Sequence, residues 1–254
     1  MKWTKKTSFF LLLSCFPIVI SAQSITIDAT KTADELVQAL TNTSSCLTIY
    51  PATASGSPIK KSFATFNKNG STFPFTSGIV LSTWESENSK GPYDPGFSGS
   101  VASWNGDSNL DAILGINSLN ATTLEFEFES KTNYLSFNYL FASNEYIRDY
   151  PCNYSDGLAI LIKDVTTNSN YSNIAALPDG TAVSSKNIHP AISSSDPTLT
   201  KCEAKNEKYF GQYNTNLTNL SPINYAGQTT ILNAKSKLEI GHKYKIKFVI
   251  AEDR

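Results

Sequence analysis

The chain has 254 residues, of which 17% are charged, with 21 basic and 22 acidic side chains. Its basic residues are scattered and are not grouped with stacking aromatic residues, which argues against a nucleic-acid-binding surface. Removing a predicted N-terminal leader would leave 18 basic and 22 acidic residues and a formal charge of −4. Residues 23–254 are enough for one large domain with its own core.

Residues 1–22 have the pattern of a secretory signal peptide. Three lysines precede an apolar stretch, residues 9–20, and small residues follow at Ser21 and Ala22. The stretch is too short to span a bilayer comfortably, and no other apolar run of spanning length follows. A lipoprotein signal at Cys15 is the alternative. We therefore expect a secreted or surface-displayed chain, cleaved near Ala22, without a transmembrane segment.

The next elements in the chain predict a mostly β domain. Residues 32–40 form the one clear helical pattern, because Thr32 can cap a helix and Glu35 follows three residues later. Short apolar runs between polar turns predict strands at residues 25–27, 47–50, 79–82, 123–128, 134–141, 158–162, 229–232 and 244–251. We expect a β-sandwich of jelly-roll-like character with one short N-terminal helix and long surface loops.

Two long regions, residues 86–109 and 166–224, have neither helical nor strand periodicity. Loops of that length inside a compact domain are usually functional or mobile. The second is rich in proline and small polar residues, so we expect it to run over the surface. Residues 232–240 fit either a helical turn or a strand.

The connection between the strands predicted at residues 134–141 and 158–162 is rich in carboxylates and predicts a calcium site. Ca²⁺ takes roughly six to eight oxygen ligands, often from loops held together by strands. We expect the end of the last strand to close the shell. The predicted ligands are Glu145, Asp149, Asp156, Glu252 and Asp253. The alternative is a solvated acidic loop in which Arg148 neutralises Asp149.

Three cysteines follow the leader, so at most one intrachain disulfide can form. Cys152 and Cys202 are the preferred pair, because both lie in loops beside polar runs, whereas Cys46 lies next to a predicted strand. The alternative is that all three are buried free thiols.

An enzymatic alternative rests on Glu125, Glu127 and Glu129, which alternate along one predicted strand. Neighbouring positions on the same face are about 7 Å apart, which is close to the spacing used in two-carboxylate glycoside hydrolysis. A β-sandwich glycoside hydrolase is therefore the second hypothesis. The competing interpretation is a half-buried strand with these glutamates in water.

Four residues in or beside the first long region suggest carbohydrate binding, namely Trp84, Tyr93, Trp104 and Asp107. Aromatic faces pack on sugar rings while carboxylates orient hydroxyl groups. The alternatives are that the aromatic side chains fold back onto the core and that Asp107 belongs to an ordinary Asx turn.

The order of several motifs resembles the choice-of-anchor L domain family. They are SGIVLST at residues 77–83, LSFNYLFASNEY at 135–146, SDGLAILI at 155–162 and YKIKFVIAED at 244–253. The resemblance covers nearly all of residues 23–254. It implies an exported bacterial domain, common in Bacteroidetes, that precedes variable adhesive modules and a C-terminal sorting or anchoring signal, with no established catalysis.

The sequence departs from the family pattern at three places. Asn144 stands where a second acidic residue is usual, Gly157 and Leu158 follow Asp156, and the sequence stops at Arg254, where a further strand is usual. We therefore expect a domain truncated at its C-terminus. The function that we expect is that of a non-catalytic, adhesin-type binding domain with Ca²⁺, whose partner is an extracellular glycan or surface protein.

Overall fold

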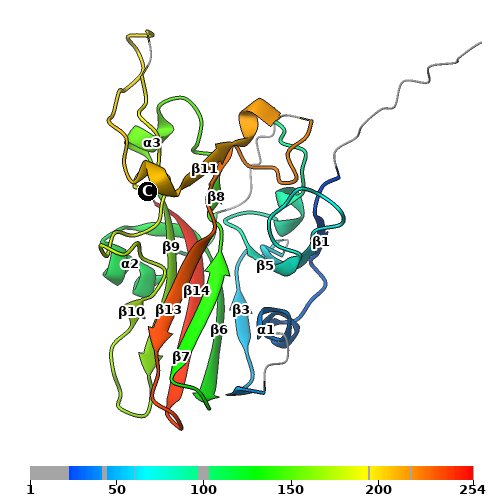
Figure 1. The fold of residues 1–254 in the computed structure, drawn as a ribbon, viewed down its shortest axis with the longest axis vertical. Coiled ribbons are helices and arrows are strands. Elements are labelled where there is room, and N and C mark those ends of the chain that lie inside the picture. Colours follow the sequence, from blue (N-terminus) through cyan, green and yellow to red (C-terminus); the bar gives the residue numbers. More distant parts are fainter. Residues whose placement is uncertain are drawn as a thin grey trace, which may run out of the picture.

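The structure is a computed structural model that describes residues 23–41, 45–59, 61–96, 103–193, 195–217 and 219–253. The predicted leader, residues 1–22, lies outside the described residues. Within them the chain is mostly β, with several antiparallel sheets and few helices (Figure 1). The predicted fold class is confirmed, and the arrangement of facing layers is consistent with a β-sandwich.

The largest sheet forms one layer. Its strands are β2 (Leu47–Ile49), β3 (Thr53–Ser55), β6 (Ser118–Ser130), β9 (Asp156–Asp164), β10 (Ser172–Asn173) and β14 (Lys243–Asp253). Their order is β10-β9-β14-β6-β2, and β3 also pairs with β6. The long strand β14 lies in the middle and pairs antiparallel with β6 on one side and β9 on the other. This register fixes the position of both ends of β14.

Two smaller sheets and a helix face this layer. One is the pair β7 (Tyr134–Tyr139) and β13 (Leu232–Lys237), and the other is β1 (Thr26–Asp28), β4 (Phe63–Asn67) and β5 (Ser77–Leu81). Figure 1 shows β7 and β13 lying across the front of the large sheet, with β5 and helix α1 (Ala33–Thr41) beside them. Most of residues 232–240, which the sequence left open, therefore form a strand.

The remaining elements lie at the end of the sandwich or behind it. They are β8 (Ala142–Ser143), β11 (Phe210–Tyr213), β12 (Gly227–Thr229), α2 (Ser108–Leu114), α3 (Tyr150–Asn153) and the 3₁₀ turns at Ser86–Ser89, Glu207–Tyr209 and Asn214–Leu217. Strands β11, β12 and β8 form a small sheet. Helix α2 covers the rear of the large sheet, where Leu110 packs with Leu161 and Val249.

Helix α1 begins as its sequence predicts. The Thr32 N–H donates to the Glu35 carboxylate at 2.8 Å, and the Glu35 N–H donates to Thr32 Oγ1 at 3.3 Å. This is the reciprocal capping box that satisfies two N–H groups at the start of a helix. The buried side chains of Leu36 and Val37 then attach α1 to the core.

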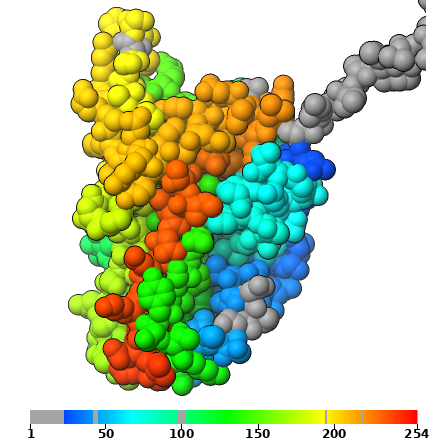
Figure 2. Space-filling model, viewed as in Figure 1, coloured from blue at the N-terminus to red at the C-terminus, as the bar shows by residue number. Residues whose placement is uncertain are grey.

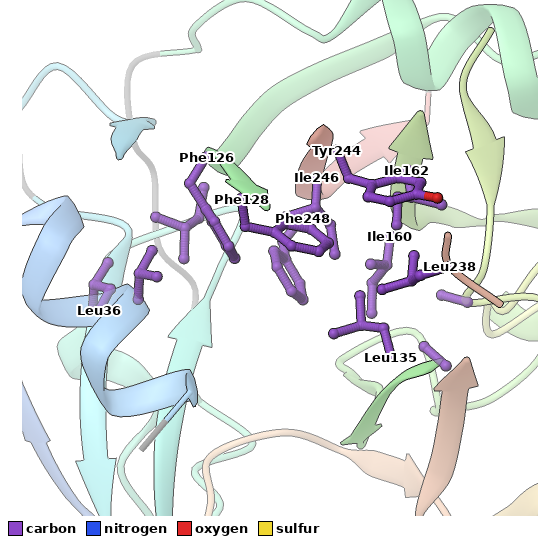
Figure 3. Packing of buried hydrophobic residues seen from close by; sticks show 14 residues of the cluster. Leu36, Phe126, Phe128, Leu135, Ile160, Ile162, Leu238, Tyr244, Ile246 and Phe248 are labelled. Carbon is purple, nitrogen blue, oxygen red and sulfur yellow. The ribbon is translucent and has the colours of Figure 1, made fainter. Parts of the chain in front are cut away.

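The main core fills the space between the layers (Figure 3). Phe126 and Phe128 of β6 and Phe248 of β14 point toward Leu135 of β7 and the β13 side of the sandwich. Phe248 is stacked on Phe126 with ring centroids 6.3 Å apart. The alternation of apolar and polar residues in β6, β7 and β14 therefore places one face of each strand in the core, as predicted.

The expectation that residues 166–224 run over the surface is only partly correct. Leu177, Val183 and Ile188 in this region are buried and pack against Phe141 and Tyr146. They form a second core cluster at the end of the sandwich. Sequence periodicity does not reveal it, because single apolar residues on irregular backbone have no repeat to recognise.

Candidate functional site

A cavity of about 900 Å³ opens between β5 and β7. Its floor includes Leu158 and Ile160 of β9 and Phe248 of β14. Residues 77–83 form one wall and residues 136–145 the other. We call this cavity the cleft. Figure 2 shows this face of the molecule, where the green residues of β7 lie beside the blue and cyan residues of the N-terminal part.

Four carboxylates line one end of the cleft, and we call them the acidic cluster. They are Glu145, Asp156, Glu252 and Asp253. The pairing of β9 with β14 places Asp156 directly opposite Glu252, and Asp253 follows in the chain. Glu145 comes from the connection after β8. All four side chains are half-buried.

Neutral donors hold these carboxylates. The hydroxyl of Ser143 donates to Asp156 at 2.9 Å, and the side-chain amide of Asn120 donates to Glu252 at 2.8 Å. The hydroxyl of Ser185 donates to Glu145. Among the described residues, none of the four forms an ion pair with a lysine or arginine. The negative charge of the acidic cluster is thus left without a cation from the described part of the chain.

Burial raises the pKa of three members of the acidic cluster. Desolvation is the largest cause for Glu145, Asp156 and Glu252, and the neighbouring carboxylates raise the pKa of Glu145 and Asp156 further. Hydrogen bonds from Ser185, Ser143 and Asn120 oppose these shifts without cancelling them. Both causes act because two negative charges in a site of low polarity are costly.

The raised pKa values give a defined pH dependence in the absence of metal. A carboxyl that holds its proton more tightly when folded stabilises the protein at low pH, and that contribution is lost as pH rises through the folded pKa. In EGTA, wild type should therefore lose stability relative to Asp156→Asn as pH rises from the ordinary range of an aspartate pKa, about 4, toward neutrality. Urea unfolding of both proteins across this range measures the difference.

The matched control for this pH dependence is Glu127→Gln. The pKa of Glu127 is lowered, first by its hydrogen bond with Lys243, so its contribution is lost only as pH falls below the ordinary range of a glutamate, and Glu127→Gln should show no such change as pH rises. A difference between wild type and Asp156→Asn that stays constant with pH would contradict the assignment of a raised pKa to Asp156.

A buried hydroxyl beside the acidic cluster is also unsatisfied. The side chain of Tyr146 is 1% exposed, and within the described part of the chain its hydroxyl has no hydrogen-bond partner. Desolvation raises the pKa of Tyr146, and the charges of Glu145 and Asp156 add to the effect. Buried polar groups are normally paired. Tyr146 belongs to the second core cluster and does not line the cleft, so its unsatisfied hydroxyl lies behind the acidic cluster.

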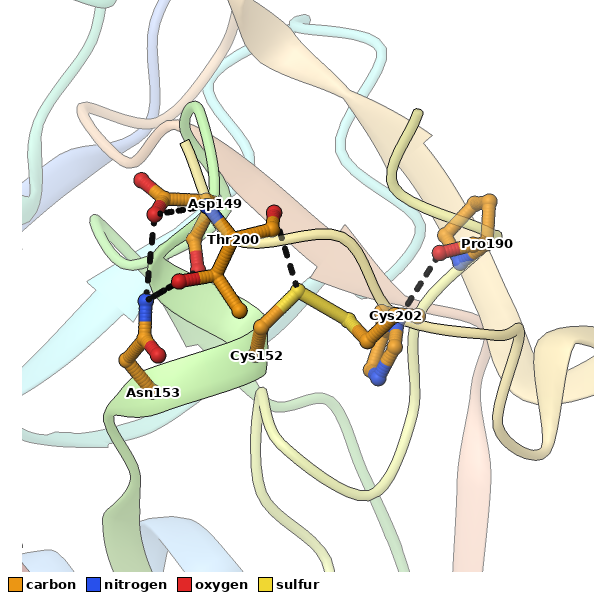
Figure 4. Close-up of a disulfide and its surroundings, with 7 residues drawn as sticks. Asp149, Cys152, Asn153, Pro190, Thr200 and Cys202 are labelled. Carbon is orange, nitrogen blue, oxygen red and sulfur yellow. Dashed lines mark hydrogen bonds between the residues drawn. A yellow bond between two sulfur atoms is a disulfide. The ribbon is translucent and has the colours of Figure 1, made fainter. Parts of the chain in front are cut away.

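Asp149, the fifth predicted ligand, has a different role (Figure 4). Its carboxylate accepts from the Thr200 N–H at 2.9 Å and from the Asn153 side-chain amide at 3.1 Å. These bonds lower its pKa, the Thr200 N–H contributing most. Asp149 thus ties its loop to residue 200 and does not join the acidic cluster. Its hydrogen bonds go to these groups and not to Arg148.

The predicted disulfide is confirmed. Cys152 and Cys202 are bonded, with their Cα atoms 5.8 Å apart, next to the bonds made by Asp149 (Figure 4). Cys46 lies outside the disulfide and is exposed, so the alternative of three buried thiols is wrong. The disulfide and the Asp149 bonds connect the acidic loop to the long region 166–224.

The acidic cluster has no preformed arrangement for a metal ion. Over the described residues, no group of three or more His, Cys, Asp and Glu side chains is arranged to hold one metal ion. The fold brings four of the five predicted ligands to one place without giving them coordinating geometry. A metal would require them to rotate toward each other.

The glutamates of the enzymatic alternative form a cross-strand charge ladder. Glu125 pairs with Lys245 at 2.7 Å, and Glu127 pairs with Lys243 at 2.6 Å. Glu129 lies opposite Lys243 in the register. None of the three lines the cleft. The three glutamates thus lie on the outer face of β6 with half-buried side chains, and Glu125 and Glu127 pair with lysines of β14.

The residues proposed for sugar binding are spread over different contacts. The Trp104 indole N–H donates to the Ala121 carbonyl at 2.8 Å. Tyr93 packs against the second core cluster, which contains Phe141. Trp84 lines the cleft. Asp107 caps α2, accepting from the N–H groups of residues 109 and 110, and binds Lys247 at 2.5 Å. The contacts of the described residues thus tie Trp104 to β6 and Asp107 to α2 and β14.

Comparison with known protein families places residues 24–254 in one family, described as the Choice-of-anchor L domain. The chain belongs to this family. Membership of the choice-of-anchor L family indicates a surface-associated extracellular protein, and the Cys152–Cys202 disulfide fits an extracellular location. No curated protein and no solved structure matches the chain. Of the helices in the described residues, none has the length and apolar character needed to cross a bilayer.

Proposed function

We propose that this choice-of-anchor L domain is a non-catalytic binding module of an extracellular surface protein and that its ligand occupies the cleft. The observation that carries the proposal is a large cleft with an apolar floor and an uncompensated acidic end. Ligand sites typically combine apolar walls with a few polar groups that fix orientation. We favour a surface protein over a glycan as partner, because the floor of the cleft is apolar.

The second part of the proposal is that Ca²⁺ binds at the acidic cluster. Glu145, Asp156, Glu252 and Asp253 supply hard oxygen donors, which are the ligands that Ca²⁺ prefers. Desolvation and mutual repulsion disfavour the ionised state, and a divalent cation would remove the repulsion. Ca²⁺ accepts variable coordination geometry, and the proposal requires the four side chains to rotate toward one another.

Thermal unfolding of residues 23–254 in EGTA, in Ca²⁺ and in Mg²⁺ tests the calcium part. An ion that binds only the folded state at a hundredfold excess over its Kd adds about 2.7 kcal/mol. For a domain of this size we expect a rise in Tm of about 5 to 10 °C. Mg²⁺ should give less, because it requires stricter octahedral geometry and gives up water reluctantly.

Isosteric variants separate the site from general charge effects. Asp156→Asn and Glu145→Gln should abolish the Ca²⁺ response while preserving shape. Glu129→Gln removes one carboxylate on the outer face of β6 and should keep the full response. An equal rise with Mg²⁺, or no rise with Ca²⁺ in wild type, would exclude a calcium site at the acidic cluster.

A further inference from the structure

Lys247 of β14 makes different contacts from the other two lysines of its strand. The side chains of Lys243 and Lys245 are 38% and 29% exposed, and both pair with glutamates of β6. The side chain of Lys247 is only 11% exposed and pairs with Asp107, which is buried to the same extent. Glu125 lies opposite Lys247 in the register but pairs with Lys245. Lys247 is therefore bound to the start of α2 and not to the charge ladder.

The amino group of Lys247 contacts two side chains at the start of α2. Its Nζ lies 2.5 Å from Oδ2 of Asp107 and donates to Oδ1 of Asn109 at 2.9 Å. Asp107 is the N-cap residue of α2, and its Oδ1 accepts from the N–H groups of Asn109 at 3.1 Å and Leu110 at 3.0 Å. The cap therefore holds the Asp107 carboxylate and the Asn109 amide next to the same nitrogen atom.

Apolar residues lie next to this group of side chains. Leu161 of β9 is opposite Lys247 in the register, and Val249 is the next residue of β14 on the same face. Both are buried and pack with Leu110 of α2. Such surroundings disfavour charged forms, so they favour transfer of a proton from the amine to the carboxylate. The neutral amine would then lie beside Cγ of Asn109, and holding two reacting groups together removes a large part of the barrier to their reaction.

We propose that Lys247 and Asn109 become joined by an intramolecular isopeptide bond and that Asp107 catalyses its formation. Asp107 takes a proton from Nζ as general base, and the neutral Nζ attacks Cγ of Asn109. The bond that forms is Nζ–Cγ, and the bond that breaks is Cγ–Nδ2. Two protons pass from Nζ to Nδ2 through Asp107, so the leaving group departs as ammonium and neither an oxidant nor a reductant is needed. The reaction depends on neither the cleft nor Ca²⁺.

The isopeptide bond would fix α2 to the middle strand of the large sheet. Lys247 and Asn109 are 138 positions apart in the chain. A cross-link over that length restricts the unfolded chain in the same way as a disulfide, but a reducing agent does not open it. Because β14 pairs with both β6 and β9, the bond would hold α2 to the strand that joins the two halves of this sheet.

Mass spectrometry of a tryptic digest of the wild-type protein tests the bond directly. The digest should contain residues 91–131 joined to residues 246–254, without cleavage after Lys247. The mass of the joined pair should be one ammonia below the sum of the two peptides. The digest is needed in addition to the intact mass, because an N-terminal glutamine such as Gln23 also loses ammonia.

Two results of the digest would overturn the proposal. Recovery of the two peptides unlinked, with cleavage after Lys247, would mean that Lys247 forms only an ion pair with Asp107 and a hydrogen bond with Asn109. A joined pair that has lost water instead of ammonia would place the bond on the carboxylate of Asp107, which contradicts both the assignment to Asn109 and the catalytic role of Asp107.

Three variants assign the roles of the residues. Lys247→Arg keeps a positive charge beside Asp107, but a guanidinium does not lose its proton and cannot attack, so the link should be absent. Asp107→Asn keeps a residue that can cap α2 but removes the proton acceptor, so Lys247 and Asn109 should stay unlinked. Lys245→Arg is the matched control and should be linked as fully as wild type. Full linkage in Asp107→Asn would contradict its role as the base.

Denaturing gel electrophoresis under reducing conditions gives a second measurement, which needs no digestion. Wild type and Lys245→Arg should migrate faster than Lys247→Arg, because a closed loop of 138 positions keeps the unfolded chain more compact. Equal migration of all three proteins would contradict the cross-link. The wild-type digest decides the question even if a variant fails to fold, because it requires no substitution.

Discussion

Replacing both Cys152 and Cys202 with serine should lower the free energy of unfolding by about 4 kcal/mol. The bond joins residues 50 positions apart, and in the chain-entropy model closing a loop of that length restricts the unfolded chain by about this amount. Urea unfolding of the double variant and of the oxidised wild type measures it directly.

The control for the disulfide is Cys46→Ser, the same chemical change at an exposed position. It should alter stability by less than about 0.5 kcal/mol. A loss below about 1 kcal/mol in the double variant would mean that other contacts already hold the loop. The bonds from Thr200 and Asn153 to Asp149 are then the contacts to remove next.

Phe128→Ala should cost about 3 to 5 kcal/mol, because it leaves a cavity between the two layers of the sandwich. Phe128 is 1% exposed, and its ring centroid lies 6.1 Å from that of Phe126 and 5.6 Å from that of Tyr244. Chemical unfolding measures the loss. Ile240→Ala, at a side chain that is 67% exposed, should change stability by less than about 0.5 kcal/mol.

Phe128→Leu separates the cavity from the loss of aromatic contacts. It keeps most of the apolar volume and should recover more than half of the stability lost in Phe128→Ala. If Phe128→Ala costs less than about 1.5 kcal/mol, the layers can close around the missing ring, and the core between β6 and the opposing strands is less tightly packed than the ring distances indicate.

The sequence predicts the elements whose signals are local. The capping residues Thr32 and Glu35 lie beside the helix that they start, and the alternation in β6 and β14 is contained within each strand. The sequence pattern does not predict helix α2, because Asp107 there fits a ligand role or an Asx turn as well as a helix cap. Its seven residues give too few turns for a clear apolar repeat.

The acidic cluster was predictable only in part. Grouping Glu145, Asp156 and Glu252 required the last strand to lie next to the strand after the acidic loop, which was a hypothesis about topology that the structure supports. Closeness in sequence groups Asp149 with these residues, but its hydrogen bonds from Thr200 and Asn153 hold it elsewhere. Ser185 and Asn120, which contact the acidic cluster, come from distant segments and carry no local signal.

The position of β14 also has a consequence for the order of events during synthesis. The strand at the middle of the large sheet is the last one described in the chain, and both of its neighbours precede it. While residues 243–253 are still missing, β6 and β9 have no strand to join them. Pairings between distant segments form slowly. The large sheet of the described residues can therefore be completed only after residues 243–253 have been synthesised.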